Sequence, residues 1–303
     1  MLITLLGMSN MLYAGSSAPT LEAKSPTESV VILVPPSVLE RLQVFLRHGE
    51  SPERFNDYAR AGNYRDLTDY LLLRRALATG GNRLPVIVEP WLDVSYERVL
   101  LRLKAGHATV FSNGIWREDI AQGDSQVRAS PPLFRYGEFE VGLYMSPQNP
   151  KLQTTKTLAD LQKLSAVSSK QWRPDWMALE SLGLVSIFDN VHWESMVKMV
   201  HSQRVDFMLA GFSTRPDLSY EAMGLTLKPI PGMKVKLAGS RGWAVSLSHP
   251  QGRKTYTVIA KGLAKMRRQG VIYRAYRDAG VINEAVAEWQ VLNPETVPLR
   301  TSH

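Results

Sequence analysis

The residues that most often carry catalysis or bind metals are scattered along this chain. Among its 303 residues there is no cysteine, so disulfides, thiolate zinc sites and cysteine nucleophiles are excluded. The six histidines are isolated, and none has an HxxxH or HxH spacing or a patterned carboxylate beside it. The chain also lacks GxSxG, GxGxxG and P-loop motifs. We therefore expect no catalytic residue, no metal and no cofactor.

The charge is strongly basic, which favours an anionic partner. Lys and Arg number 36 against 28 Asp and Glu, a formal net charge of +8. The basic residues are spread along the chain, and the densest runs, Arg74-Arg75 and 265–268, lie on segments with helical periodicity. No helix-turn-helix, zinc-finger or aromatic RNA-binding motif accompanies them. A nucleic-acid partner is not expected.

The N-terminal end resembles a secretory leader. Residues 1–14 are apolar and uncharged, too short to span a bilayer, and are interpreted as a signal peptide that ends near Ala14. The basic residues that usually precede such a run are missing, so a fortuitous apolar terminus is the alternative. Residues 15–27 are polar and predicted to be disordered. This pattern predicts a periplasmic location.

The rest of the chain alternates between strand and helix patterns. Strands are predicted at 30–34, 86–88, 108–111, 166–167, 185–188 and 205–209. Helices are predicted at 67–78, 96–104, 176–181 and 193–200, and 258–279 is mostly helical with an interruption near Gly270.

One helix-turn-strand unit occurs twice. The segments 96–114 and 193–211 share apolar positions at i, i+3, i+4 and i+7, then a turn, a buried strand and a glycine, at an offset of 97 residues. Either the chain consists of two similar lobes, or an α/β protein has repeated a common unit by chance. Two extended apolar stretches bound the second copy, 139–145 and 242–247, and are predicted to be strands that cross between lobes.

These features predict a division into two lobes with terminal segments. The predicted parts are 1–14 signal peptide, 15–27 disordered segment, 28–140 plus 245–290 lobe one, 141–244 lobe two, and 291–303 C-terminal tail.

Several segments, in order, resemble family 3 of the type II periplasmic solute-binding proteins, the amino-acid-binding proteins of ABC transporters. They are VLLRLKAG, HATVFSNG, IWREDIAQ, SPPLFRYGEFEVGLY, TKTLADLQKLSAVSS, MVKMVHSQRVDFMLAGF and RGWAVSLSHP, within about 28–285. The resemblance implies an α/β fold of two lobes, each a mixed sheet flanked by helices, joined by two crossing hinge strands.

The resemblance further implies a ligand cleft between the lobes, formed by strand ends and helix N-termini. The implied contacts are Ser112, Asn113, Gly114, Ser169, Gln171, Trp172, Gly211, Phe212 and Ser213. Arg117 matches the family's carboxylate-binding arginine, although it follows the strand more closely than usual, and Trp116 stands where a threonine turn is expected. The alternative is that Arg117 pairs locally with Glu118 or Asp119. Four tryptophans in loop-like or helix-start positions are candidates for stacking on a ligand: Trp91, Trp116, Trp172 and Trp176. Trp193 and Trp243 lie on periodic segments and are expected in the core.

One departure from the family bears on the ligand. Gly211 stands where amino-acid binders usually place an aspartate for the ligand's ammonium group. We therefore expect a small polar solute, anionic or zwitterionic, that need not be a standard amino acid. The expected partners are this solute and a membrane permease or sensor receptor, with the chain a monomer. A dehydratase-like periplasmic enzyme of the same fold and a sensory or interaction module that no longer binds amino acids are the alternatives.

Overall fold

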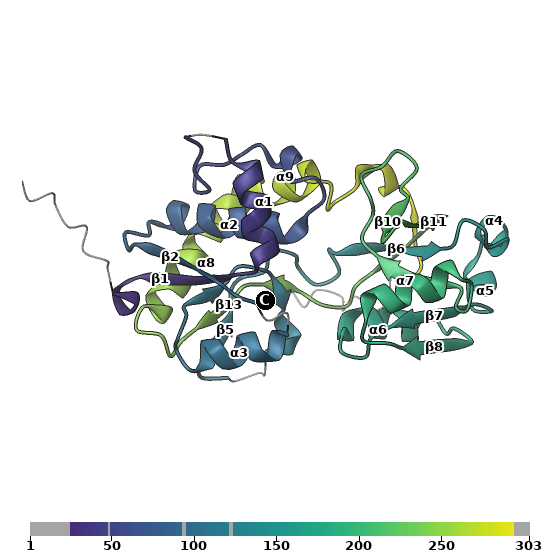
Figure 1. The fold of residues 1–303 in the computed structure, drawn as a ribbon, viewed down its shortest axis with the longest axis horizontal. Helices are drawn as coiled ribbons and strands as arrows, with labels where there is room; N and C mark the ends of the chain where they lie inside the picture. The colour runs from purple at the N-terminus through teal and green to yellow at the C-terminus, as the bar shows by residue number, and fades with distance from the viewer. Residues whose placement is uncertain (1–24, 48, 93–94, 121–123, 294–303) are drawn as a thin grey trace, which may run out of the picture.

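The computed structural model describes residues 25–47, 49–92, 95–120 and 124–293, and shows two α/β lobes side by side (Figure 1). Each lobe is built on its own mixed sheet, and helices cover both faces of each sheet. We call the lobe that contains β1 lobe one and the lobe that contains β7 lobe two. The predicted fold class is confirmed.

The sheet of lobe one has the strand order β2-β1-β3-β13-β5. The strands β1, β2 and β3 are parallel, and β13 runs antiparallel to both of its neighbours. Their bounds are β1 Val30–Val34, β2 Val86–Pro90, β3 Val110–Phe111, β5 Val127–Ala129 and β13 Ala244–Ser246. The helices of this lobe are α1 Pro36–Phe45, α2 Arg65–Gly80, α3 Tyr96–Lys104, α8 Gly252–Arg268 and α9 Val271–Asp278.

Alternate residues of β1 explain why helices cover both faces of this sheet. Val30, Ile32 and Val34 join the apolar cluster that contains α2 and α8. Val31 and Leu33 join the cluster that contains α3. Because successive strand residues point to opposite faces, an uninterrupted apolar run such as 30–34 is typical of a strand buried on both sides.

Lobe two has a sheet of the order β10-β11-β6-β9-β7-β8, with β14 paired to β11. Its strands are β6 Glu140–Met145, β7 Ser165–Ser168, β8 Ser186–Asp189, β9 Phe207–Ala210, β10 Tyr220–Ala222, β11 Leu225–Lys236 and β14 Gln290–Val291. Its helices are α4 Lys151–Thr154, α5 Leu158–Leu161, α6 Arg173–Ser181 and α7 Trp193–His201.

The helix-turn-strand repeat found in the sequence is a structural repeat. Helices α3 and α7 begin and end 97 residues apart, and Val110 of β3 corresponds to Phe207 of β9. Three parallel strands in the orders β2-β1-β3 and β8-β7-β9 form the core of the two sheets. In each sheet the next strand is antiparallel and follows a connection from the other lobe, β13 in one and β6 in the other.

The connections between the lobes differ in part from the prediction. The first enters lobe two along β6, within the predicted stretch 139–145. The second returns at 237–240, because β12 (Arg241–Gly242) already pairs with β4 (Ile115–Trp116) of lobe one. The stretch 242–247 is therefore a strand segment of lobe one, where 244–246 pair with β3 and β5, and is not itself the crossing.

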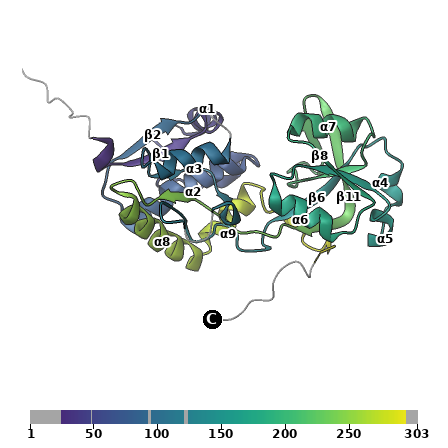
Figure 2. The same cartoon turned by 90° about the horizontal axis from the view of Figure 1, so that it is seen from below.

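A third connection was not predicted (Figure 2). After α9 the chain returns to lobe two, where β14 pairs in parallel with β11. Residue 290 therefore belongs to the sheet of lobe two. Lobe one was predicted to extend to residue 290, so its end was placed too far along the chain. The Nζ atom of Lys234 holds this connection by donating to the carbonyl oxygens of Val286 (2.8 Å) and Ala287 (3.0 Å), and it lies 2.8 Å from a carboxylate oxygen of Glu140.

The predictions for the termini are tested only in part. The signal peptide, 1–14, lies outside the described residues, as do 15–24 of the predicted disordered segment and 294–303 of the tail. Residues 26–28 form a 3₁₀ helix, so order begins earlier than predicted. Ser25 precedes this turn and its hydroxyl accepts a hydrogen bond from the Thr27 amide (3.4 Å), which stabilises it. None of the described helices is long and apolar enough to cross a bilayer.

Helices α2 and α8 approach closely because glycines lie at their contact. A Cβ atom added to Gly262 would overlap the carbonyl oxygen of Ala76, and one added to Gly80 would overlap the carbonyl oxygen of Val258. The helix α2 then ends at Gly81, whose φ of 88° suits a left-handed C-terminal cap. This helix pair covers one face of the lobe-one sheet and positions the start of α2 at the cleft.

We predict that Gly262→Ala lowers the free energy of unfolding by about 1–3 kcal/mol, since the added methyl must push two packed helices apart. Alanine's higher helix propensity offsets only part of this cost. Urea denaturation measures the change. Gly211→Ala is the matched control, because no atom lies within 4 Å of a Cβ added there. A Gly262→Ala variant as stable as Gly211→Ala would contradict this account of the helix contact.

Candidate functional site

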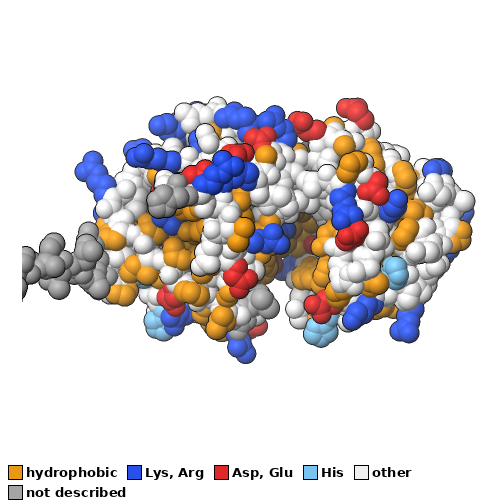
Figure 3. Space-filling view, turned by 45° about the horizontal axis from the view of Figure 1, so that its top comes forward, with side chains coloured by type: hydrophobic (Ala, Val, Ile, Leu, Met, Phe, Trp, Pro, Cys, Tyr) orange, Lys and Arg blue, Asp and Glu red, His pale blue; other side chains and the backbone are white. Residues whose placement is uncertain are grey.

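A hollow between the lobes contains a cavity of about 460 Å³ with walls from both lobes. Figure 3 looks onto the molecule where this hollow opens. Lobe one contributes the start of α2, β4 and the adjoining 3₁₀ helix Arg117–Asp119, and lobe two contributes the start of α6 and the end of β9. The connections contribute Phe139 and Leu237, and Arg241 of β12 follows the second connection. We call this cavity the cleft.

A carboxylate and a guanidinium lie together behind the wall of the cleft. The side chains of Asp69 and Arg241 are 1% and 3% exposed, and Arg241 Nη2 lies 4.0 Å from Asp69 Oδ2. Asp69 also accepts hydrogen bonds from the Tyr276 hydroxyl (2.6 Å) and the Gly114 amide (2.8 Å). Arg241 in turn donates to the Gly114 carbonyl. Burial raises the pKa of Asp69, and the nearby charges of Arg241 and Arg65 oppose that rise.

Aromatic rings cover the Arg241 guanidinium. Its Cζ atom lies 5.0 Å from the centre of the Trp116 ring and 6.0 Å from that of Phe139. These two rings meet edge to face at 6.0 Å, and Phe139 meets Phe134 in the same way at 4.9 Å. Phe134 and Phe139 lie on the first connection and Arg241 follows the second. The ion pair and its aromatic cover therefore join both connections to lobe one.

Two further carboxylates face the cleft, Asp119 from lobe one and Asp175 from lobe two. Among the described residues, no side chain forms a hydrogen bond or ion pair with either of them. Loss of hydration raises the pKa of Asp175 to about 6, despite the opposing charges of Arg241 and Arg65. Burial also raises the pKa of Asp119, which the charge of Arg173 partly opposes. Both carboxylates thus lie in poorly hydrated positions without a counter-ion in contact.

Aromatic side chains form much of the remaining surface of the cleft. Those that line it are Tyr64, Tyr96, Trp116, Phe139, Trp172, Trp193 and Tyr220. In lobe two they form a continuous wall, with ring centres 6.2 Å apart between Trp172 and Trp193 and 5.8 Å apart between Trp193 and Tyr220. Trp193 was expected to be a core residue because it lies on a periodic segment. It packs at the edge of the α7 cluster and also reaches the cleft.

Four of the predicted site residues come together in the cleft. Trp116, Gln171, Trp172 and Gly211 all line it, two of them through aromatic rings. Trp172 is the residue before α6, and Gly211 follows directly after β9. A helix start and a strand end named from the sequence therefore form part of the cleft wall.

The other predicted residues do not line the cleft. Ser112 and Asn113 are buried and bond to each other, the Ser112 hydroxyl donating to the Asn113 side chain at 2.8 Å. Gly114 lies behind the wall, where its amide and carbonyl bind Asp69 and Arg241. The buried Ser169 hydroxyl accepts a hydrogen bond from the Gln171 amide at 3.2 Å. These groups therefore make hydrogen bonds inside their own lobes and do not face the cleft.

Phe212 and Ser213 have a different role from the predicted one. Their carbonyl oxygens accept hydrogen bonds from the side chains of Asn63 (2.9 Å) and Asn283 (2.8 Å). The Phe212 ring packs edge to face on Trp289 at 5.4 Å. Because Asn63 is in lobe one and Asn283 in the third connection, these two residues hold lobe two to its neighbours.

Arg117 is exposed and its side chain is not part of the cleft wall. Its backbone amide donates to the Ser240 carbonyl (2.8 Å), while the Glu118 carboxylate accepts from the Ser240 amide (3.1 Å). The arginines that line the cleft are Arg65 and Arg241, and neither was predicted from the sequence. A signal for the partner of Arg241 was present, since Asp69 is a charged residue among the apolar positions of α2.

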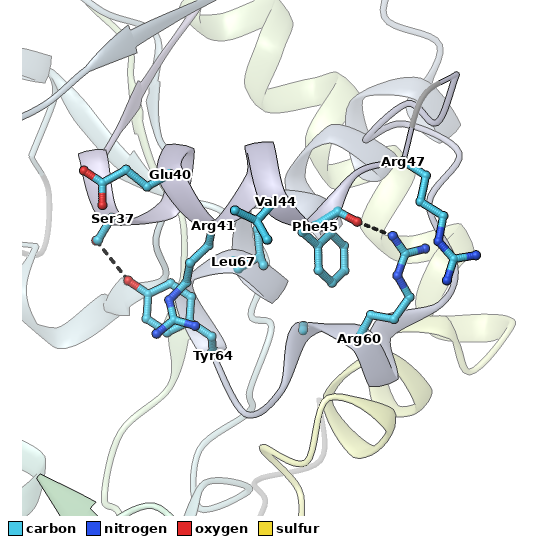
Figure 4. A pocket seen from close by; sticks show the side chains of 10 residues that line it. Ser37, Glu40, Arg41, Val44, Phe45, Arg47, Arg60, Tyr64 and Leu67 are labelled. Carbon is cyan, nitrogen blue, oxygen red and sulfur yellow. Dashed lines mark hydrogen bonds between the residues drawn. The ribbon is translucent and has the colours of Figure 1, made fainter.

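A larger cavity, about 830 Å³, is lined by α1, the 3₁₀ helix Tyr58–Ala61 and the start of α2 in lobe one (Figure 4). There Arg41 stacks on Tyr64 at 4.1 Å, and the Tyr64 hydroxyl donates to Ser37 (2.9 Å). Arg60 donates to Glu50 (2.9 Å) and to the Phe45 carbonyl. Its walls come from lobe one alone, so the smaller cleft, which both lobes line, is the better candidate site.

Both lobes have the same strand order, and in each the antiparallel strand is reached through a connection from the other lobe. This topology identifies the fold. The chain has the type II periplasmic-binding-protein fold. No protein-family model and no curated protein matches its sequence. Its similarity to known proteins is therefore a similarity of structure.

Several solved structures resemble this type II fold distantly. The substrate-binding protein of an amino acid ABC transporter from Streptococcus pneumoniae, bound to L-arginine, is 14% identical, with 83% of this chain and 94% of that chain covered and a TM-score of 0.47. The second substrate-binding domain of GlnP from Lactococcus lactis, in an open conformation, is 12% identical, with 83% and 95% covered and a TM-score of 0.47. The unliganded L-cystine receptor of Neisseria gonorrhoeae is 14% identical, with 82% and 90% covered and a TM-score of 0.44. Such weak similarities transfer no ligand to this chain.

We predict that Arg241→Ala destabilises the protein by about 3–5 kcal/mol, because Asp69 would be left buried without its cation. Arg117→Ala, the matched control, should change the free energy of unfolding by less than about 0.5 kcal/mol, since this side chain is exposed. Urea denaturation at neutral pH compares the two. Equal effects would show that the buried pair does not have the structural role assigned to it.

Proposed function

We propose that this protein binds a small organic solute in the cleft and closes its two lobes around it. The observation that supports this most directly is that the cavity has walls from both lobes, so a bound solute would contact both. Ligand contacts are proposed for Trp116, Gln171, Trp172 and Gly211, which line it. A solute that bridges two lobes stabilises the closed form over the open one.

The connections between the lobes are suited to such a motion. The first two run antiparallel, with hydrogen bonds from the Leu237 amide to the Phe139 carbonyl (2.9 Å) and from the Arg241 amide to the Phe134 carbonyl (2.9 Å). A short paired segment can twist without losing these bonds, while each lobe keeps its own sheet. We propose that bending occurs here and that Lys234 keeps the third connection attached to lobe two.

We further propose that the protein works in the periplasm as a monomer. Its closed, loaded form would be recognised by a membrane permease for uptake or by a sensor receptor for signalling. Support for the location comes from the apolar, signal-like N-terminal residues 1–14. Both classes of partner would recognise the same conformation, in which the lobes are closed on a solute.

A second candidate is a dehydratase-like enzyme that uses the same cleft. Asp175 favours it, because a carboxyl group whose pKa is about 6 can act as a general acid or base near neutral pH. Prolonged incubation with each ligand, followed by chromatography, separates the candidates. Recovery of unchanged ligand supports the binder, and conversion that is lost in Asp175→Asn supports the enzyme.

A thermal-shift screen of a library of small solutes tests the proposed function. A ligand at about 100 times its Kd should stabilise the protein by about 2.7 kcal/mol. The same ligand should reduce the radius of gyration in solution scattering, because the lobes close. Trp172→Ala should weaken both effects, whereas Lys163→Ala, which removes an exposed side chain of lobe two that does not line the cleft, should leave them unchanged. Stabilisation without compaction would contradict closure.

A further inference from the structure

The charges of the cleft divide into paired and unpaired groups. Arg65 is paired with Asp66, with Nη2 3.1 Å and Nε 3.3 Å from Asp66 Oδ1. Arg241 is paired with Asp69, and its Nη2 donates to the Gly114 carbonyl. The guanidinium groups that could bind an anionic solute are therefore already neutralised. Asp119 and Asp175 remain, and their carboxylates contact no cation among the described residues.

The N-terminus of α6 is also unfavourable for an anion. A free helix N-terminus attracts anions through its unpaired amide groups. In α6 the second position is Pro174, which has no N–H, and the third is Asp175, whose carboxylate already lies at the positive end of the helix. An anionic solute at this helix would approach the Asp175 carboxylate and be repelled by it. This helix start therefore does not favour the anionic solute that the sequence predicted.

The aromatic wall adds an independent preference for positive charge. Trp172, Trp193 and Tyr220 form a continuous aromatic surface in lobe two, opposite Trp116 in lobe one. Trp116 also approaches Pro174, since a Cβ added to Gly239 would lie between them, 2.9 Å from Trp116 and 3.1 Å from Pro174. Asp175 follows Pro174 in the chain and lines the same cleft as Trp116 and Trp172. Desolvated ammonium groups bind well where a carboxylate and aromatic rings adjoin.

We propose that the solute is an organic cation, an amine or quaternary ammonium compound, whose positive charge is bound by Asp175 and the surrounding indole rings. This rests on the proposed function and specifies the class of its ligand. Asp119 faces the same space from lobe one and adds to the negative potential. The cations near these groups are Arg65 and Arg241, which are paired, and Arg173, which lies near Asp119. An acidic cleft in a chain of net charge +8 selects its ligand by local charge.

Pairs of probes with the same shape and different charge test this proposal. Choline is compared with 3,3-dimethylbutan-1-ol, its uncharged carbon isostere, and 2-phenylethylamine with 2-phenylethanol and 3-phenylpropanoate. At pH 7.5 calorimetry should show at least one ammonium probe binding about tenfold or more tightly than its uncharged partner. Equal or tighter binding of the alcohols or the carboxylate would overturn the proposal while leaving a solute-binding cleft in place.

Single-charge variants locate the binding. Asp175→Asn should weaken binding of the ammonium probe about tenfold or more. Glu194→Gln removes the same charge from an exposed position one residue beyond Trp193 and should change it less than about twofold. If both variants bind the cation as the unaltered protein does, Asp175 is not its partner. If no library member binds in a way that Trp172→Ala weakens, the proposed function itself fails.

The pH dependence provides a readout that a structural role would not produce. The raised pKa of Asp175, about 6, means that this carboxylate takes up a proton below that pH. Cation affinity should then fall by up to about tenfold per pH unit below 6, and in Asp175→Asn this dependence should disappear.

Without ligand, protonated Asp175 favours the folded state, and this stabilisation is lost as the pH rises through 6. Asp175→Asn should therefore raise the unfolding temperature more at pH 7.5 than at pH 4.5. A reversed pH trend in affinity would contradict the assignment.

Discussion

The buried pair of Asp69 and Arg241 is the constraint on which the two-lobed arrangement depends. Either charge alone in the interior would be costly, so both must be present and correctly placed. Asp69 lies on α2, Arg241 directly follows the second connection, and the Gly114 turn bonds to both. Three segments distant in sequence must therefore meet at one point. This meeting point determines where the returning chain enters lobe one, and thereby the position of the cleft wall that Trp116 and Phe139 form over it.

The hinge is packed as well as hydrogen-bonded. Phe134, Phe139 and Leu237 belong to an apolar cluster that continues from lobe one into lobe two. Tyr276 of α9 packs on Phe134 with ring centres 4.3 Å apart, while its hydroxyl binds Asp69. The connections thus have an apolar, hydrogen-bonded interior. The closure proposed above would bend this packed segment while each lobe keeps its own sheet.

The cleft shows how local charge can differ from the charge of the whole chain. Most of the 36 Lys and Arg residues are on the surface, where solvent screens them. In the cleft the two arginines are neutralised by neighbouring aspartates, and what remains is acidic and aromatic. The repeated unit contributes to this: in lobe one α3 presents Tyr96 to the cleft, and in lobe two α7 presents Trp193. The same position of a duplicated element therefore supplies an aromatic ring from each side.

The sequence by itself determined the elements and their repetition. The period of apolar residues predicted α3 with its observed bounds, and the run 30–34 predicted β1, because burial of a helix stripe or a strand is a local pattern of side chains. Strand ends and helix starts pointed to Gln171, Trp172 and Gly211, and Trp116 was named as a candidate for stacking; all four line the cleft. Only the tertiary structure decided the rest. It placed Arg241 beside Asp69, left Arg117 in solvent and returned the chain to lobe two through β14. It also left the carboxylates of Asp119 and Asp175 without an ion-pair partner in the part of the chain that the structure describes. Those outcomes depend on which distant residues meet. Whether an arginine or an aspartate is paired depends on its neighbours in space, and the periodicity of the sequence does not specify those neighbours.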